Sequence, residues 1–263
     1  MTVPDVIAAR LRAAGCVFAE DEARLLVESA GTPAELTAMV GRRVAGEPLE
    51  HVLGWAELGG VRVAVGPGVF VPRRRTELLV REAVATTRPG AVVVDLCCGA
   101  GAVGLAVVAA VRPVELHAVD VDPVAVRCAR RNLAAVGGKV HQGDLYGPLP
   151  AGLRGRIDVL VANAPYVPSG ELRLMPPEAR LHEPRVALDG GADGLELHRR
   201  IADGAPPWLA PGGHLLIETS ERQAARTAGA LAAAGLAARV TGPDEVGACV
   251  AIGRRSAQSR TSP

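Results

Sequence analysis

From residue 91 onwards, short apolar runs alternate with helical patterns, and this alternation constrains the fold more than any other feature. The apolar runs are rich in β-branched residues, as buried parallel strands are, and lie at 91–94, 115–119, 157–162 and 213–218, with weaker runs near Val140, Val240 and 249–252. Helical patterns fill the gaps at 102–111, 123–136, 194–209 and 221–234. The alternation predicts an α/β fold with a doubly wound sheet. Its ligand would bind beyond the carboxyl ends of the strands, where the strand order reverses.

Residues 2–45 have a different pattern, which is typical of three short helices. The third is the clearest, because Thr32-Pro33-Ala34-Glu35 is a capping box with proline at the first helical position. An apolar stripe at helical spacing follows, made of Leu36, Met39, Val40 and Val44. Gly46 and Pro48 then end the helix. The sequence therefore predicts a small helical domain over residues 1–48.

Residues 51–65 predict a β-hairpin, since Gly59-Gly60 can form the turn before the alternating Val61, Val63 and Val65. We expect residues 49–72 to be a β-hairpin linker and residues 73–253 to form the α/β domain. The polar tail, residues 254–263, is predicted to be disordered.

Composition excludes several classes of protein. The 29 basic and 28 acidic residues give a net charge of +1, so no overall field favours nucleic acid or an anionic membrane. No apolar run approaches the roughly 20 residues of a membrane span. The five cysteines include no CxxC pair and the six histidines show no metal-ligand spacing. We therefore expect a reduced, cytoplasmic protein without a metal.

A glycine-rich loop follows the strand predicted at 91–94. Gly99, Gly101 and Gly104 match G-x-G-x-x-G, which by itself would suggest a dinucleotide. Asp95, before the loop, favours S-adenosylmethionine instead, because a carboxylate repels phosphate but attracts the cationic amino and sulfonium groups of that cofactor. Asp120 ends the next strand, where it could accept hydrogen bonds from the ribose hydroxyls.

Three further residues near this loop have two interpretations each. Asp144, at the end of the third strand, could accept from the adenine amino group, with Leu145 against the ring, or could cap a helix. The adjacent Cys97 and Cys98 could be nucleophiles, but small polarizable fillers of the loop are the better interpretation.

The strand predicted at 157–162 ends in Asn163-Ala164-Pro165-Tyr166. A planar amide or aromatic amine is a poor nucleophile because its lone pair is delocalised. The Asn163 side-chain carbonyl and the main-chain carbonyl of Ala164 could accept its two N–H groups and stabilise the charge that develops on methylation. The alternative is an ordinary turn after a strand.

These motifs resemble those of the protein-glutamine N5-methyltransferases that modify peptide-chain release factors. Residues 163–166 are similar to the Asn-Pro-Pro-Tyr motif of amino methyltransferases, and the flanking motifs fall in the family's order. Those flanking motifs are Gly46-Glu47-Pro48-Leu49, residues 66–73, Thr76-Glu77-Leu78-Leu79, Glu183-Pro184-Arg185, residues 187–191 and Asp193-Gly194-Leu195. The resemblance covers roughly residues 1–253.

The resemblance implies a Rossmann-like methyltransferase domain that uses S-adenosyl-L-methionine, preceded by a helical domain that docks the protein substrate. The implied cofactor contacts are Cys97, Cys98, Gly99, Ala100, Gly101, Asp120, Leu145 and Asn163. The implied contacts of the acceptor glutamine, in a Gly-Gly-Gln loop of a release factor, are Asn163, Ala164, Pro165 and Tyr166.

The chain departs from the family pattern at three places. Ala164 replaces the first proline of the motif, Cys97 replaces the first loop glycine, and Arg74-Arg75 replace a Pro-acid pair. Three alternatives therefore stay open. They are an adenine-N6 methyltransferase acting on DNA or RNA, a cofactor-binding paralogue with a different acceptor, and an NAD oxidoreductase. The nucleic-acid enzyme would need a basic groove, whereas residues 1–60 carry nine acidic and five basic groups.

Overall fold

The computed structural model describes residues 2–257 and confirms the predicted α/β fold. Its central sheet has the strand order β5-β4-β3-β6-β7-β9-β8. The strands β3 to β7 are parallel, and β9 runs antiparallel to both of its neighbours. The strand bounds are β3 Ala91–Leu96, β4 Val114–Asp120, β5 Lys139–Gln142, β6 Ile157–Ala162, β7 Leu209–Ser220, β8 Ala237–Thr241 and β9 Ala248–Arg254. The chain leaves β3 towards β4 and β5 and then crosses to β6, so the strand order reverses at β3.

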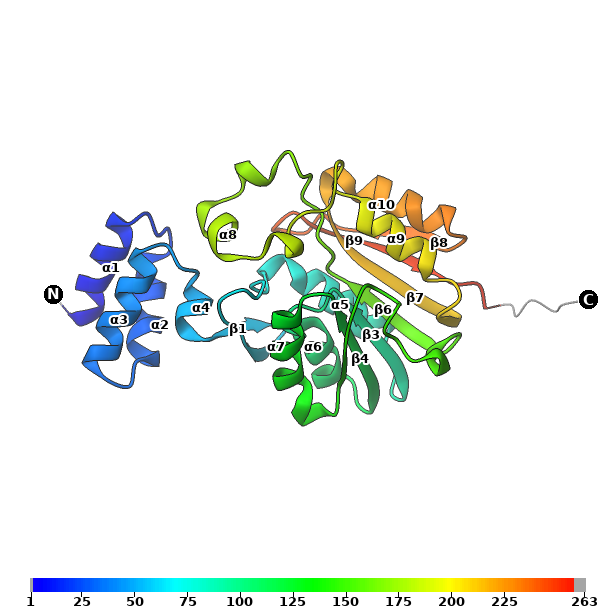
Figure 1. Cartoon of the computed structure of the whole chain (residues 1–263), viewed down its shortest axis with the longest axis horizontal. Helices are drawn as coiled ribbons and strands as arrows, with labels where there is room; N and C mark the ends of the chain where they lie inside the picture. The colour runs from blue at the N-terminus through cyan, green and yellow to red at the C-terminus, as the bar shows by residue number, and fades with distance from the viewer. Residues whose placement is uncertain (1, 258–263) are drawn as a thin grey trace, which may run out of the picture.

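Helices cover both faces of this sheet (Figure 1). They are α5 Glu77–Thr86, α6 Ala102–Ala110, α7 Pro123–Leu133, α9 Glu196–Gly204 and α10 Glu221–Ala233. A short helix, α8 Pro177–His182, lies outside these layers, in the segment between β6 and α9. Every residue of β3 is buried, and its side chains alternate between two apolar clusters, with Val93 in one and Val94 in the other. Apart from Asp95, this central strand is apolar because both of its faces pack against helices.

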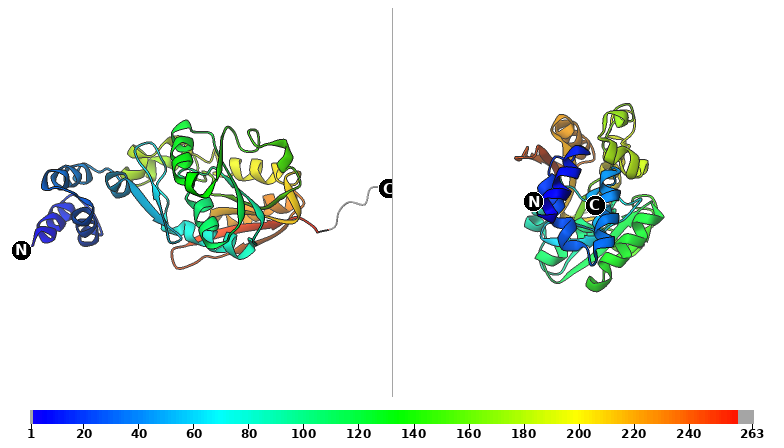
Figure 2. Two further views of the ribbon diagram at one scale, coloured as in Figure 1. Left: turned by 90° about the horizontal axis from the view of Figure 1, so that it is seen from below. Right: turned by 90° about the vertical axis from the view of Figure 1, so that its left-hand side faces the viewer.

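The predicted three N-terminal helices are confirmed as α1 Val3–Ala13, α2 Ala19–Ser29 and α3 Pro33–Val44. They lie beyond one end of the sheet and have their own small core (Figure 2). The Thr32 hydroxyl accepts the Glu35 N–H at 3.1 Å, as a cap does. The reciprocal bond differs from the predicted capping box, because the Glu35 carboxylate accepts the N–H of Gly31 and not that of Thr32.

Several predicted boundaries were wrong. The hairpin is shorter than expected, with β1 Trp55–Leu58 and β2 Val61–Ala64, because residues 49–53 form a further helix, α4. The helix predicted at 194–209 ends at Gly204, and β7 begins at Leu209. Helices α5 and α8 were not predicted.

The predicted disordered tail also begins too early. Arg254 is the last residue of β9, and the Arg255 N–H donates to the Gly213 carbonyl at 2.9 Å. The rest of that prediction, over 258–263, lies outside the described residues. Within residues 2–257, no helix is both long and apolar enough to cross a membrane, and all five cysteines are free.

A buried ion-pair network joins the N-terminal helices to the segment around α8. The Arg43 guanidinium, on α3, donates to Glu22 of α2 at 2.6 Å and to Glu178 of α8 at 2.9 Å. Arg43 and Glu22 are both buried. Farther along the chain, Arg73 pairs with the buried Glu183. These contacts fix the helical domain against the wall of the cavity described below, which Glu178 and Glu183 help to line.

We expect Arg43→Ala to lower the free energy of unfolding by about 3 kcal/mol, because it leaves a buried carboxylate without its cation. Urea denaturation of the whole chain, followed by circular dichroism, measures this loss. The matched control is Arg24→Ala, which removes an exposed pair with Asp21 and should cost less than about 1 kcal/mol. Equal losses for the two variants would contradict the structural role of the buried network.

Candidate active site

A cavity of about 920 Å³ opens beyond the carboxyl ends of the central parallel strands. It lies where the strand order reverses, as the alternating pattern predicts. The structure brings together at this cavity all but one of the predicted site residues, namely Cys97, Cys98, Gly99, Ala100, Asp120, Asp144, Leu145, Asn163, Ala164, Pro165 and Tyr166. Gly101 is the exception. It precedes α6 with φ of 77°, and a Cβ there would come within 3.1 Å of Leu133, so its part is to shape the loop.

The glycine-rich loop turns sharply between β3 and α6. Cys97, Gly99 and Gly101 all have positive φ, at 55°, 55° and 77°. No heavy atom lies within 4 Å of where a Cβ on Gly99 would be, so the loop is open at that point. The position at which this chain departs from the family glycine, Cys97, is therefore one that a glycine would adopt without strain.

Asp95 lies before the loop and in the cavity lining, and its carboxylate also has a structural contact. It is the last residue but one of β3 and is buried, and its carboxylate accepts the Gly104 N–H at 2.9 Å, near the start of α6. Burial raises the pKa of Asp95 to about 7. The carboxylate thus secures the loop to the helix, in addition to lining the cavity.

Asp120 ends β4 as predicted, and its two oxygens hold backbone N–H groups on either side of it. Oδ2 accepts from Gly99 at 2.8 Å and Oδ1 from Asp122 at 2.9 Å. Burial raises the pKa of the carboxyl group, while these backbone bonds lower it. Each carboxylate oxygen can accept a second hydrogen bond, so the group remains able to receive hydroxyls from the cavity.

Asp144 and Leu145 follow β5, which ends at Gln142, so Asp144 does not end a strand as predicted. The exposed Asp144 carboxylate pairs with Arg200 of α9. Leu145 is buried and has a φ of 45°, an unusual conformation for a leucine. The side chain that packs at the cavity wall is therefore Leu145, whereas Asp144 lies at the rim.

Asn163 directly follows β6, and its side chain is held by a residue distant in sequence. Its Nδ2 donates to the hydroxyl of Thr76, which is buried, at 3.1 Å. Because the amide nitrogen is used in this way, the side-chain oxygen is the group left for other partners. Pro165 favours extended geometry at Ala164.

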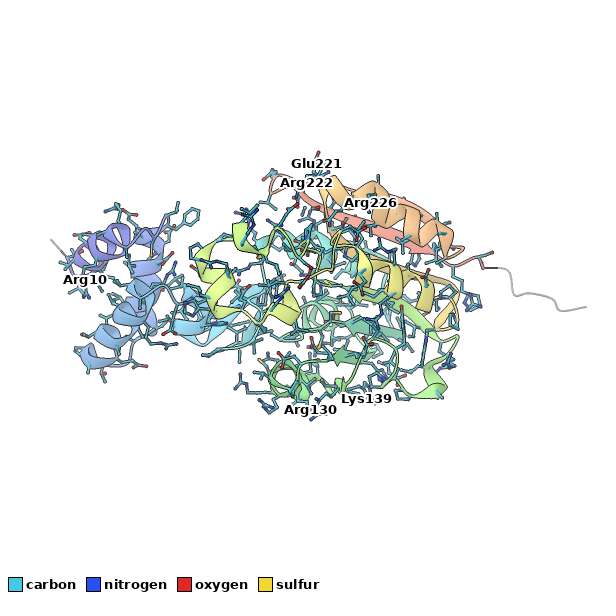
Figure 3. All side chains as sticks on the ribbon, turned by 45° about the horizontal axis from the view of Figure 1, so that its top comes forward. Arg10, Arg130, Lys139, Glu221, Arg222 and Arg226 are labelled. Carbon is cyan, nitrogen blue, oxygen red and sulfur yellow. The ribbon has the colours of Figure 1, made fainter. Side chains whose placement is uncertain are left out.

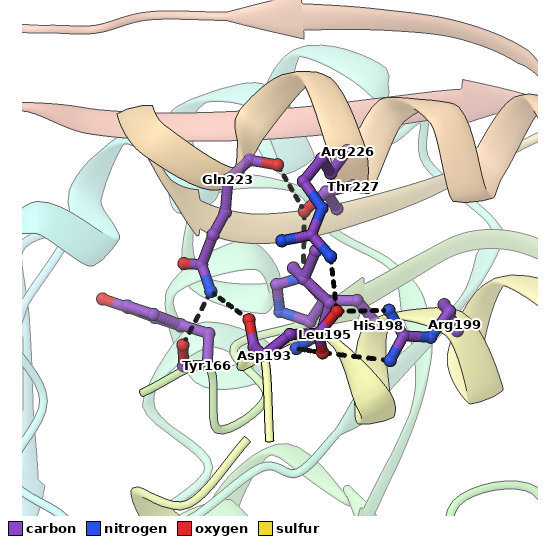
Figure 4. Close-up of polar contacts among 8 residues, drawn as sticks. All are labelled: Tyr166, Asp193, Leu195, His198, Arg199, Gln223, Arg226 and Thr227. Carbon is purple, nitrogen blue, oxygen red and sulfur yellow. Dashed lines mark hydrogen bonds and ion pairs between the residues drawn. The ribbon is translucent and has the colours of Figure 1, made fainter. Parts of the chain in front are cut away.

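Tyr166 is held at its hydroxyl and at its main-chain carbonyl. Arg75 donates to the hydroxyl at 3.0 Å, and the hydroxyl in turn lies 3.4 Å from Oε1 of Glu218. Nε2 of Gln223, on α10, donates to the Tyr166 carbonyl at 2.9 Å and also to the Asp193 carbonyl (Figure 4). These two bonds link the loop after β6 to the loop before α9.

Six residues that support this site were not predicted as site residues: Arg75, Thr76, Gly190, Gly194, Glu218 and Gln223. A Cβ on Gly194 would come within 2.3 Å of the Tyr166 carbonyl oxygen, and one on Gly190 within 2.7 Å of the Tyr166 Cα. The two glycines therefore let the segment after α8 pack directly on the backbone of residues 163–166. Both belong to motifs that carry the family resemblance, which is the only signal that could have identified them.

The thiols of the loop are poor nucleophiles. Burial raises the pKa of both Cys97 and Cys98 far above the ordinary value of a thiol, and nearby carboxylates raise it further. A thiol that stays protonated at neutral pH does not attack. The geometry favours the interpretation of both cysteines as fillers of the loop.

We expect Cys97→Gly to raise the free energy of unfolding by up to about 1 kcal/mol, because glycine adopts a positive φ without steric cost. Thermal melting measured with and without the cofactor tests this. The matched control is Cys98→Gly, since Cys98 is buried but is not among the residues with positive φ, and its loss should destabilise the fold. Destabilisation by both changes would show that sulfur packing outweighs backbone strain at residue 97.

Comparison with known proteins bears on what this site does. Residues 60–192 match the methyltransferase small domain family. The chain is 36% identical over 228 residues to a release factor glutamine methyltransferase of Geobacter sulfurreducens, covering 85% of this chain and 79% of the relative. It is also 38% identical over 195 residues to a 4-amino-L-phenylalanine/4-methylamino-L-phenylalanine methyltransferase of Streptomyces pristinaespiralis. This match covers 71% of this chain and 65% of the relative.

Among solved structures, a methyltransferase from Pyrococcus furiosus matches with a TM-score of 0.56 at 16% identity, covering 74% of this chain and 88% of that chain. At this identity the likeness concerns the fold alone. The family assignment rests on the extent and level of sequence identity to the relative from Geobacter sulfurreducens. Residues 60–192 match the methyltransferase small domain, and the match to this relative over 85% of the chain shows that the chain belongs to the release factor glutamine methyltransferase family.

Proposed function

We propose that this enzyme transfers a methyl group from S-adenosylmethionine to the side-chain amide nitrogen of a glutamine in the Gly-Gly-Gln loop of a peptide-chain release factor. The observation that carries the proposal is the Asn163 amide. Its nitrogen is committed to Thr76, and its oxygen is therefore available to accept an amide N–H in the cavity. The name of the relative from Geobacter sulfurreducens, release factor glutamine methyltransferase, supports a glutamine of a release factor as the acceptor.

The cavity fits the cofactor by size and by the chemistry of its lining. The residues that would hold S-adenosylmethionine are Asp120 at the ribose hydroxyls, Leu145 at the adenine ring, and Cys97–Ala100 along the loop. The carboxylates in this lining also suit a cofactor with cationic groups. The cofactor supplies a methyl group on a positively charged sulfur.

At the acceptor end, two carbonyl groups orient the glutamine amide. The Asn163 side-chain oxygen and the main-chain oxygen of Ala164 would each accept one N–H of the glutamine amide, which holds the nitrogen with one face free for attack. As the nitrogen takes the methyl group, positive charge develops on it, and the two fixed oxygens stabilise that charge until one N–H proton is lost to water. Replacement of the family proline by Ala164 keeps the carbonyl, so the departure is compatible with this role.

The substrate in this proposal is a protein that docks on the N-terminal helices. Their acidic balance would complement a basic, RNA-facing factor, so the enzyme itself needs no direct contact with nucleic acid. Release factors act in the cytoplasm, and we place the enzyme there. Its five free cysteines agree with a reducing compartment.

Mass spectrometry of purified release factors incubated with the enzyme and S-adenosylmethionine tests the proposal. We expect one added methyl group on the glutamine of the Gly-Gly-Gln loop, and none on a factor in which alanine replaces that glutamine. Methylation of 4-amino-L-phenylalanine, with unmodified release factors, would instead give this chain the acceptor class of the relative from Streptomyces pristinaespiralis.

We expect Asp120→Asn to weaken binding of S-adenosylmethionine at least tenfold, since it removes the charge from hydrogen bonds to the ribose and from those to the loop. Isothermal titration calorimetry measures the affinity. Asp203→Asn makes the same chemical change at an exposed position of α9 and should leave the affinity unchanged. Unchanged affinity in Asp120→Asn would remove Asp120 from the cofactor site.

We expect Asn163→Ala to lower the methylation rate by about 10²–10³, the scale for losing one preorganised polar contact in a transition state. Cofactor affinity should change far less, because the rest of the lining stays in place. Single-turnover rates with labelled cofactor separate the two effects. Wild-type rates in this variant would make residues 163–166 a structural turn, and the proposed mechanism would fail.

A further inference from the structure

A buried carboxylate, Glu218, lies beside the acceptor end of the cavity and has no part in the reaction described so far. It lies on β7 and is only 2% exposed, yet it contributes to the cavity lining. Ala162 of β6 pairs with Ile217 of β7, so the next residues on the two strands, Asn163 and Glu218, come side by side. Among residues 2–257, its Oε2 is buried without a hydrogen-bond partner.

Glu218 is connected to both functional side chains of residues 163–166. Its Oε1 lies 3.4 Å from the Tyr166 hydroxyl. On the other side, the Thr76 hydroxyl interacts with the carboxylate and favours its charged form, and the same hydroxyl accepts the Asn163 amide at 3.1 Å. The Glu218 carboxylate therefore interacts with Tyr166 directly and with Asn163 through Thr76. These are the two side chains that would meet the acceptor.

The Thr76 hydroxyl has a single proton, so it can donate a hydrogen bond either to Glu218 or to Asn163. If that proton goes to the Glu218 carboxylate, the hydroxyl oxygen can only accept, and Asn163 must present its NH₂ group to Thr76. If Glu218 were neutral, Thr76 could donate to the Asn163 oxygen. The side-chain amide of Asn163 could then rotate by half a turn and present its NH₂ group to the cavity. There, a donor would face the N–H donors of the acceptor, and no hydrogen bond could form.

We propose that Glu218 is a positioning residue that sets the orientation of the Asn163 amide through Thr76. The proposal deepens the proposed function and rests on it only for the kinetic consequence. The orientation of the amide is a property of the enzyme alone and can be measured without an acceptor.

The charges around Glu218 make the orientation depend on pH. Burial raises the pKa of Glu218 to about 7, Asp244 raises it as well, and Thr76, Arg75 and Tyr166 lower it. The carboxylate form holds Thr76 as a donor, so the productive orientation is favoured above that pKa and lost as pH falls through it. The methylation rate should rise with pH between about 6 and 8.

Nuclear magnetic resonance can follow the amide directly, because Asn132 and Asn163 are the only asparagines in the chain. Selective ¹⁵N-asparagine labelling gives two side-chain NH₂ signals. We expect the Asn163 signals to shift with pH around 7 in the wild type and to stay constant in Glu218→Gln. Asn132 is an internal control, since its amide is held by Ala64 and Ala100.

Kinetics supply the second readout. We expect Glu218→Gln to lower kcat by about tenfold at pH 8 and to flatten the pH profile, with KM for S-adenosylmethionine within about twofold of wild type. Thr76→Val should behave in the same way, and Thr76→Ser, which keeps the hydroxyl, should restore the wild-type profile. The matched control is Glu221→Gln, at the surface where α10 begins (Figure 3), which should change neither readout.

Wild-type Asn163 signals and a wild-type pH profile in Glu218→Gln would overturn the proposal. Should Glu218→Gln fail to fold, Thr76→Val breaks the same connection, and a pH-dependent Asn163 shift that persists in it would overturn the proposal equally. A wild-type enzyme that does not methylate release factors contradicts the proposed function instead, and the amide signals then decide about Glu218 independently.

Discussion

The parallel pairing of β3 with β4 and β6 is the constraint on which the site depends. Leu96 pairs with Val119 on one side and with Ala162 on the other, so the three strands end at one level. The residues at or just beyond these strand ends, including Cys97, Asp120 and Asn163, therefore line one cavity although they are far apart in sequence. Burial of both faces of β3 fixes this register, because a slip of one residue would exchange the side chains of its two apolar clusters.

Features that depend on local pattern could be predicted from the sequence. Five apolar residues, interrupted only by Asp158, made β6 recognisable to the residue, and the glycines before α6 marked the loop. Asn163 could be predicted because a polar residue at the end of a buried strand faces the ligand side of a doubly wound sheet. Boundaries failed where a pattern was mixed, as at residues 49–53, where a short helix without a side-chain N-cap continues the apolar core of the N-terminal helices.

The supporting residues could not be predicted, because their contacts arise from strand order and not from spacing. Thr76 lies 87 positions before Asn163, and Gln223 lies 57 positions after Tyr166. Nothing near Glu218 in sequence indicates that it will face Tyr166, since β7 becomes the neighbour of β6 only through the crossover. Asp144 was wrongly predicted to end a strand, because β5 ends at Gln142, and its exposed side chain at the rim of the cavity pairs with Arg200.

The three departures from the family pattern fall at positions with different physical demands. Cys97 occupies a left-handed backbone position, so its cost falls on stability and leaves the shape of the loop intact. Ala164 retains the carbonyl on which the acceptor would depend. Arg75 differs from both, because it donates to the Tyr166 hydroxyl and places a positive charge next to Glu218. Of the three, it is the departure that acts on the electrostatics of the acceptor end, where a change of side chain can tune the reaction without disturbing the fold.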